Sequence, residues 1–537
     1  MSLLPMKDAV LITSGDLRES ANRACWPAQQ ELERRLIERF AAEGVVLRRA
    51  VAVTPERGHG FVSSQREGMD IFTEIDPTAN LVFATAAWQY SHHVLPGLRS
   101  HRGPILTVAN WSGQWPGLVG LLNLNGSLVK TGQPFSSLWS EHFDDAWFIE
   151  RLHEWVTTGH VDHRVSHVRS LDDVKLPPRQ AEQAAALAER LLRKKIILGV
   201  FDEGCMGMYN AIVDDEILNP LGFFKERLSQ STLVAKMKTV DEAEAAKTLQ
   251  WLRDRGVHLS LGSDDATELT ESQLLTQCRM YIASVRLAKE FGCDAIGIQY
   301  QQGLKDSVPA SDLVEGLLNN RERPPVLDEH TGVELYAGAP LPHFNEVDEC
   351  AGVDAVITNL CWTALGQDPS TTLHDLRWGA SYPVEGRDEF VWVLQISGAA
   401  PANHFLNGYA GATSDRQPPM YFPLGGGTLK GIGRPGRIVW SRVFVEGGAL
   451  HIDLGVGSVV ELPPAEASRR WSQTTSQWPL VSAIFDGISR DAMMARHRAN
   501  HVNIVYAEKP EEALTLKAAM CQRLGLHVHL CGSVQLG

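Results

Sequence analysis

Residues 500–530 read NHVNIVYAEKPEEALTLKAAMCQRLGLHVHL, and this stretch alternates two patterns. The apolar run at 502–507 is typical of a buried strand, and residues 510–524 have the composition of a helix. Residues 526–530 then alternate apolar side chains with histidine, which is typical of a second strand. The C-terminus therefore predicts a strand–helix–strand unit.

The same alternation fills the first 160 residues. A helix face formed by Leu32, Leu36 and Phe40 follows the first strand. Strands that alternate with helices imply βαβ units and a parallel sheet covered on both faces. The predicted strands of this sheet are residues 10–13, 45–53, 81–84 and 105–109.

A charged, proline-containing stretch at 170–179 interrupts the pattern and marks a domain boundary. The strand 196–201 restarts the alternation, which continues through an amphipathic helix at 273–291 and a strand at 295–300. Beyond residue 354 the chain becomes β-rich, with Gly-Gly turn signals between apolar strands.

These patterns predict an α/β protein. Two doubly wound parallel-sheet domains are followed by an α+β domain with a β-rich, barrel-like part. The predicted domains are an N-terminal α/β domain at 1–172, a second α/β domain at 173–354 and a C-terminal domain at 355–537. The length of 537 residues agrees with about three domains.

Composition excludes several classes of function. The net charge of −14 argues against a nucleic-acid partner, because phosphate neutralisation needs clustered Lys and Arg. Eight cysteines without regular spacing are typical of reduced thiols in the cytoplasm. The N-terminus has no secretory apolar region, and no apolar stretch has the length of a membrane span.

Glu346, Asp375 and His501 are the candidate residues for chemistry. Two carboxylates and one imidazole form a set of ligands for a divalent metal with open positions, and oxygen-rich sets suit Mn²⁺ or Mg²⁺. Long intervals separate the three, 29 residues and then 126, so spacing alone does not assemble this site.

Their surroundings supply a link between them. The Asn-His pair before the C-terminal strand resembles the metal-histidine segment of the L-fucose isomerase family. Glu346, six residues before Gly352-Val353, resembles that family's glutamate ligand, and Asp375-Leu376-Arg377 resembles its aspartate ligand. Segments around Pro116-Gly117 and Cys205-Met206 resemble its first and second domains, in the same order along most of the chain.

This resemblance implies a metal-dependent aldose–ketose isomerase. It implies that Glu346, Asp375 and His501 bind Mn²⁺, with Mg²⁺ or Co²⁺ as alternatives, and that the substrate is a small monosaccharide. It further implies a cytoplasmic homo-oligomer, hexameric as in the family. The residues that it places around the sugar are Met206, Gln302, Asn500 and Trp88, the last of which reaches a neighbouring subunit's site.

Alternatives stay open at this point. If the alignment with the family is shifted, Glu349 takes the place of Glu346. The sequence also does not say which carboxylate acts as base and which as acid. A metal-dependent sugar lyase or aldolase shares the enediolate intermediate with an isomerase. A non-catalytic sugar-binding protein of the same fold is the third alternative.

The segment Arg496-His497-Arg498 departs from the family, which has mostly neutral residues there. Arginine presents a planar fork suited to carboxylate, phosphate or sulfonate groups. If this segment faces the metal pocket, Arg496 and Arg498 bind an anionic substituent of the sugar. A solvated basic turn is the simpler alternative.

Overall fold

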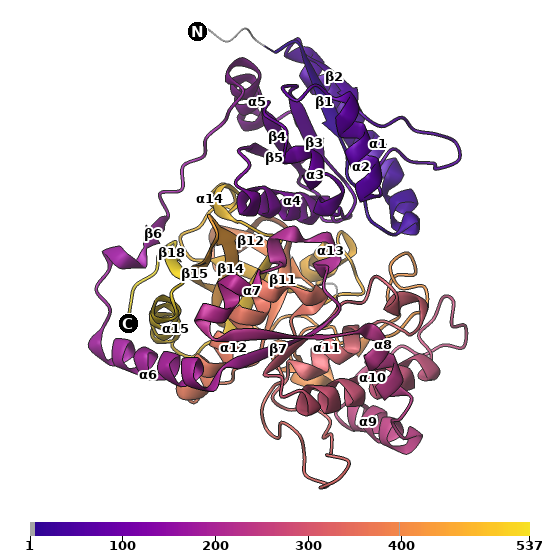
Figure 1. Cartoon of the computed structure of the whole chain (residues 1–537), viewed down its shortest axis with the longest axis vertical. Helices are drawn as coiled ribbons and strands as arrows, with labels where there is room; N and C mark the ends of the chain where they lie inside the picture. The colour runs from indigo at the N-terminus through magenta and orange to yellow at the C-terminus, as the bar shows by residue number, and fades with distance from the viewer. Residues whose placement is uncertain (1–5, 397) are drawn as a thin grey trace.

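The computed structural model describes residues 6–396 and 398–537. Figure 1 shows a first domain at the top, a β-barrel in the middle and a second α/β part below and to the side of the barrel. The α/β class expected from the sequence is confirmed. No helix among the described residues is both long enough and apolar enough to cross a lipid bilayer.

The first domain contains a five-stranded parallel sheet in the order β2-β1-β3-β4-β5, an order typical of doubly wound folds. Its strands are β1 (Asp8–Ile12), β2 (Val46–Arg49), β3 (Leu81–Ala84), β4 (Ile105–Asn110) and β5 (Ser136–Ser140). Its helices are α1 (Glu19–Ala42), α2 (Gln65–Glu74), α3 (Leu95–Leu98), α4 (Gly117–Thr131) and α5 (Ala146–Thr158). The helix α4 lies between this sheet and the barrel (Figure 1).

The second α/β part has a smaller parallel sheet of three strands, in the order β10-β7-β8. These strands are β7 (Ile196–Phe201), β8 (Phe223–Leu228) and β10 (Ala295–Ile298), and β9 (His258–Leu259) pairs separately with β13 (Thr413–Ser414). The helices are α6 (Pro178–Lys194), α7 (Asp215–Leu218), α8 (Gln230–Met237), α9 (Glu242–Asp254), α10 (Glu271–Glu290) and α11 (Asp312–Leu318).

A closed, antiparallel barrel forms the centre of the molecule. Its strands follow the order β14-β17-β11-β12-β16-β15, and β14 pairs with β15 along its whole length, so the sheet closes on itself. The strands are β11 (Thr371–Val384), β12 (Arg387–Gln395), β14 (Gly436–Glu446), β15 (Ala449–Val459), β16 (Val481–Phe485) and β17 (His501–Tyr506). Two strands extend the sheet beyond β15, namely β18 (His527–Cys531) and β6 (Val168–Ser170).

One helix of the C-terminal region spans an expected domain boundary. The helices of this region are α12 (Glu349–Ala364), α13 (Pro464–Ser472), α14 (Arg490–Arg496) and α15 (Pro510–Leu524). The boundary expected after residue 354 falls inside α12, which contacts β10 on one side and barrel strands on the other. The boundary expected after residue 172 follows β6, a strand of the barrel sheet. Local composition did not indicate these contacts because they are made across the fold.

We expect the α12–barrel contact to depend on Trp362. Its ring is fully buried in α12, and its indole N–H donates to the carbonyl oxygen of Tyr506 at 2.7 Å. Trp362→Ala should lower the free energy of unfolding by about 3–5 kcal/mol, as for other large-to-small core changes. Urea unfolding followed by circular dichroism measures this loss. Trp251 is half-buried, so Trp251→Ala should lower the free energy of unfolding clearly less. Equal losses in the two variants would contradict the role assigned to Trp362.

Candidate functional site

Glu346, Asp375 and His501 meet at one point between the second α/β part and the barrel. Nε2 of His501 lies 3.3 Å from Oδ1 of Asp375 and 3.5 Å from Oε2 of Glu346. His501 is fully buried, whereas Glu346 and Asp375 are 8 % and 6 % exposed, so the carboxylates keep a small opening to solvent. The three residues that the sequence singled out therefore form one cluster.

Strand pairing brings Asp375 to His501. In the antiparallel pair β11–β17, Asp375 stands directly opposite His501, and side chains of opposed residues lie on the same face of a sheet. Immediately beyond, the register of β11 with β12 shifts between Leu376 and Trp378. This bulge sends Arg377 toward the first domain, where its Nε donates to the carbonyl of Gly113 at 2.9 Å.

Glu346 reaches the cluster through an unusual backbone conformation. Glu346 and Val347, in the 3-10 turn η7 (Asn345–Val347), both have a positive φ, 59° and 57°. Cys205 and Met206, in η3 (Cys205–Gly207), share this conformation, and the Cys205 thiol donates to the carbonyl of Val347 at 2.5 Å. Each such non-glycine residue costs on the order of 1–3 kcal/mol, and such residues cluster at functional sites.

Asp348 fixes the other side of the His501 ring. Its Oδ2 lies 2.8 Å from Nδ1 of His501 and accepts a hydrogen bond of 2.5 Å from Arg442. Burial opposes ionisation, but Arg442 and His501 lower the pKa of Asp348 to about 2. Nδ1–H of His501 thus faces a carboxylate, which leaves Nε2 directed at Glu346 and Asp375.

The ionisation of His501 and Glu346 reflects this crowding of acids. Burial favours the neutral imidazole, but the carboxylates of Asp348, Asp375 and Glu346 raise the pKa of His501 well above its ordinary value. Burial also raises the pKa of Glu346, with a further contribution from Asp375. The cluster therefore carries more negative charge than its own side chains neutralise.

The residues present fit a divalent cation by chemistry, although they are not arranged as a formed metal shell. Among the described residues, no group of three or more His, Cys, Asp or Glu side chains has the arrangement of a metal-binding group. His501 Nε2 is nevertheless buried without a well-oriented hydrogen bond to any described residue, and it faces two carboxylates. An imidazole nitrogen and carboxylate oxygens suit Mn²⁺, Mg²⁺ or Co²⁺.

Two side chains of the first domain act electrostatically on this cluster. Arg18 is buried, forms a two-pronged ion pair with Asp16 at 2.9 and 2.7 Å, and stacks on the ring of Tyr421. The positive charge of Arg18 acts on Glu346, and the charge of Glu346 acts on Tyr90, whose buried hydroxyl has no hydrogen-bond partner among the described residues. Arg18 and Tyr90, both from the first domain, therefore interact electrostatically with Glu346.

Three other predicted residues lie in or beside this region. Asn500 donates to Oδ1 of Asp375 at 3.3 Å, so it belongs to the cluster. Met206 is buried, and its carbonyl accepts a hydrogen bond from the indole of Trp88 at 3.2 Å. Trp88 thus contacts the Met206 segment of its own chain.

The structure favours a different glutamine from the one expected. Gln302 is exposed, whereas the preceding Gln301 is buried and its Oε1 has no partner among the described residues. The strand β10 ends at Ile298, two residues earlier than the sequence predicted, so the side chains beyond it alternate differently. Gln301 therefore replaces Gln302 as the candidate for polar contacts.

The contacts of Arg496 differ from the prediction that it faces the sugar. Arg496 donates through Nε and Nη2 to both carboxylate oxygens of Asp453, at 2.8 and 2.6 Å. The charges that act on Arg498 are those of Arg496, Glu446 and Asp453. Asp453 lies on β15 and is buried, and its carboxylate occupies the fork of Arg496. Nε of Arg498, in contrast, is buried without a hydrogen-bond partner among the described residues.

A second group of buried acids lies next to Glu346. Burial raises the pKa values of Asp312 and Glu315, and the charge of Glu346 acts on both. Ser311 donates to Glu315 at 2.7 Å, while one oxygen of each acid has no partner among the described residues. These two carboxyl groups are therefore held largely in the protonated form.

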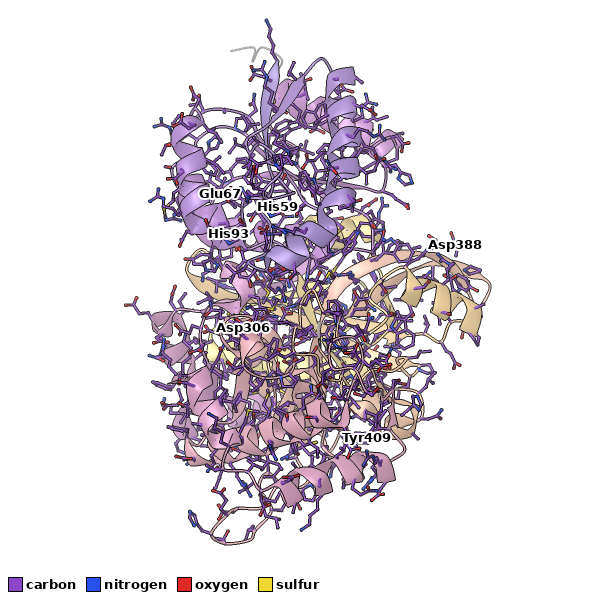
Figure 2. The ribbon with its side chains drawn as sticks, turned by 90° about the vertical axis from the view of Figure 1, so that its right-hand side faces the viewer. His59, Glu67, His93, Asp306, Asp388 and Tyr409 are labelled. Atoms are coloured by element: carbon purple, nitrogen blue, oxygen red, sulfur yellow. The ribbon has the colours of Figure 1, made fainter. Side chains whose placement is uncertain are left out.

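A cavity of about 750 Å³ lies elsewhere and does not contain the candidate metal ligands. Its lining includes Trp251, Arg323 and Tyr409. Figure 2 shows Tyr409 near the end of the molecule opposite to the first domain, which carries the labelled His59 and His93. The size of this cavity is therefore no guide to the chemistry of the His501 cluster.

Sequence reasoning missed several residues that surround the cluster. Asp348 stood in the acidic segment around Glu346, and its position two residues after a candidate ligand was the available signal. Arg18, Tyr90 and Arg442 carried no local signal, because the fold brings them from three distant segments. No protein-family model matches the chain, and no curated protein matches it.

The acids beside Glu346 predict a pH-dependent stability. The unfolded chain releases the Asp312 proton above about pH 4, whereas the folded chain retains it, so stability falls as pH rises, by at most about 1.4 kcal/mol per pH unit. Asp312→Asn cannot ionise and escapes this loss. The melting temperature of Asp312→Asn relative to wild type should therefore be higher at pH 7.5 than at pH 5.

Asp328→Asn serves as the control for this measurement. Asp328 is exposed, and backbone hydrogen bonds from Thr331 and His330 lower its pKa. Both its folded and unfolded forms are ionised from pH 5 upward, so its difference from wild type should not change with pH. An equally constant difference for Asp312→Asn would contradict the protonated state of that group.

Proposed function

We propose that the chain is a metal-dependent aldose–ketose isomerase that acts on a small monosaccharide. The observation that supports this proposal is the meeting of Glu346, Asp375 and His501 around one buried imidazole nitrogen. Two carboxylates beside one substrate can divide the acid and base roles between them, provided that their environments separate their pKa values.

Glu346, Asp375 and His501 would hold the metal, for which Mn²⁺ is the first choice. When bound, the metal would act as a Lewis acid on the carbonyl oxygen and the neighbouring hydroxyl of an aldose. Asp348 keeps the proton of His501 on Nδ1 and thereby leaves Nε2 free to act as a ligand. Asn500 orients Asp375 through its hydrogen bond to Oδ1.

Proton transfer between C2 and C1 falls to the carboxylates. Burial raises the pKa of Glu346 above its ordinary value, which makes its carboxylate a stronger proton acceptor. We therefore assign the carbon proton to Glu346 and the orientation of the sugar oxygens to Asp375. The positive charge of Arg18, in the first domain, opposes this rise in the pKa of Glu346.

Unpartnered polar groups provide contacts for hydroxyl groups of a sugar. The Tyr90 hydroxyl, Oδ1 of Asn500 and Nη1 of Arg377 are all buried without a hydrogen-bond partner among the described residues. A buried polar group without a partner costs about 1–3 kcal/mol, which a sugar hydroxyl would recover. Because Arg18 is already paired with Asp16, its charge is not available to the sugar.

Isomerisation is tested with neutral pentoses and 6-deoxyhexoses in D₂O with Mn²⁺, with ketose formation followed by NMR. A ketose of unchanged carbon number is expected, and deuterium at its C1 measures how far the transferred proton exchanges with solvent. Glu346→Gln should reduce kcat by about 10²- to 10⁴-fold with little change in melting temperature, since it removes the proton acceptor. Asp375→Asn should weaken both Mn²⁺ binding and turnover.

Glu349→Gln is the control, because Glu349 was the alternative ligand. Its carboxylate accepts a hydrogen bond from Lys225 at 3.0 Å and from the backbone of Val213 at 2.7 Å, so it should matter for stability and not for turnover. Two carbon fragments in place of a ketose would identify a lyase. Full activity of Glu346→Gln would refute the assignment.

A further inference from the structure

A continuous chain of buried hydrogen bonds leads from His501 to the first domain. Asp348 lies between His501 and Arg442, and Nη2 of Arg442 donates to Oδ1 of Asn210 at 3.3 Å. Nδ2 of Asn210 donates to Oδ1 of Asn123 at 2.8 Å. All five side chains are buried, so each bond is shielded from water.

The members of this chain come from every part of the fold. Arg442 belongs to barrel strand β14, Asn210 to the 3-10 turn η4 (Tyr209–Ala211), and Asn123 to the first-domain helix α4. Asn123 continues inward by donating to the carbonyl of Gln89 at 2.9 Å. Figure 1 shows α4 across the junction between the first domain and the barrel, where this link crosses.

We propose that Asp348, Arg442, Asn210 and Asn123 form a positioning chain through which docking of the first domain fixes the orientation of His501. This inference rests on the proposed function, because it concerns the residue that would hold the metal. Groups that hold the far nitrogen of a metal-binding histidine typically change metal affinity about 10- to 100-fold when they are removed.

Arg442 holds its two neighbours in the positioning chain at a fixed angle. Asp348 faces His501 with the same oxygen, Oδ2, that receives the Arg442 hydrogen bond. The guanidinium bonds Asp348 through Nη1 and Asn210 through Nη2, and its rigid planar shape fixes the angle between these two partners. A shift of Asn210 or α4 therefore moves Arg442, then Asp348 and then the ring of His501.

The simpler alternative is that Arg442 and Asp348 are a structural ion pair and nothing more. The protein offers a matched control for this alternative. Lys517 is fully buried and donates a hydrogen bond to Asp354 in α12, the helix that Asp348 caps. Lys517 also donates to Ser441, the neighbour of Arg442 on β14, at 2.7 Å. Lys517 makes no hydrogen bond to His501, so its loss tests stability alone.

Mn²⁺ affinity, measured by electron paramagnetic resonance of the free ion, distinguishes a positioning chain from a purely structural ion pair. Arg442→Met should weaken Mn²⁺ binding by about 10- to 100-fold. Lys517→Met should reduce the melting temperature to a similar degree while its Mn²⁺ affinity stays within about twofold of wild type. Arg442→Lys, which retains the charge but has one nitrogen in place of the planar fork, should lie between wild type and Arg442→Met.

Asn123→Leu tests the far end of the chain and leaves the buried ion pair intact. It contacts neither His501 nor its carboxylates, so an effect on Mn²⁺ must pass through Asn210 and Arg442. A weakening of about 2- to 30-fold is expected for coupling of this kind. Unchanged affinity in both Arg442→Met and Asn123→Leu, or an equal loss in Lys517→Met, would overturn the proposal.

A metal-free measurement keeps this inference distinct from the proposed function. Protein labelled with ¹⁵N-histidine reports the tautomer of His501, whose signal is identified by its loss in His501→Gln. Arg442→Met should change the Nδ1–H signal relative to wild type. If wild type binds no Mn²⁺ but this change occurs, the proposed function fails and the positioning chain stands. If Mn²⁺ binds and the signal is unaffected, the positioning chain fails alone.

Discussion

The antiparallel pairing of β11 with β17 is the constraint on which the site depends, because it sets Asp375 opposite His501. A slip of one residue would turn one of the two side chains to the other face of the sheet. Closure of the barrel prevents such a slip, since β17 is held by β14 on its other edge and β14 pairs along its whole length with β15. The two polar residues are therefore fixed by backbone pairing, and the pocket does not need to organise them.

The position of Glu346 depends on backbone strain and not on pairing within the barrel. Glu346 comes from outside the barrel and reaches His501 only through a positive φ, which the next residue shares. The thiol of Cys205 bonds the carbonyl of Val347, so two strained turns support each other. The cap that Asp348 provides to α12, through its bond to the backbone N–H of Ala351, anchors the same turn on its other side. The same carboxyl group thus begins a helix and orients His501.

Sequence patterns predicted the α/β class, most strand positions and the three clustered residues, because each had a signal within a few neighbouring residues. Asn500 beside His501 is an example, and the structure places it on Asp375. Arg442 had no such signal, because it meets Asp348 only after the barrel closes 94 residues away in the chain. The contacts of Arg496 differ from the prediction because its local charge pattern does not reveal the buried Asp453 on a neighbouring strand.

Charge balance connects the barrel, the strained turn and the positioning chain. Glu346, Asp375 and Asp348 contribute three negative charges around His501, and Arg442 contributes one positive charge. With a neutral imidazole, these four side chains keep two negative charges, which the nearby charge of Arg377 offsets only in part. Uncompensated charge in a buried region is costly. Arg18 does not remove these two charges, because Asp16 already neutralises it. A proton on His501 relieves one charge, whereas a divalent cation at Nε2 relieves both and leaves the imidazole neutral. The same balance explains why Arg442 must lie behind His501 and not beside Glu346: there it neutralises Asp348 without competing for the position that the cation would take.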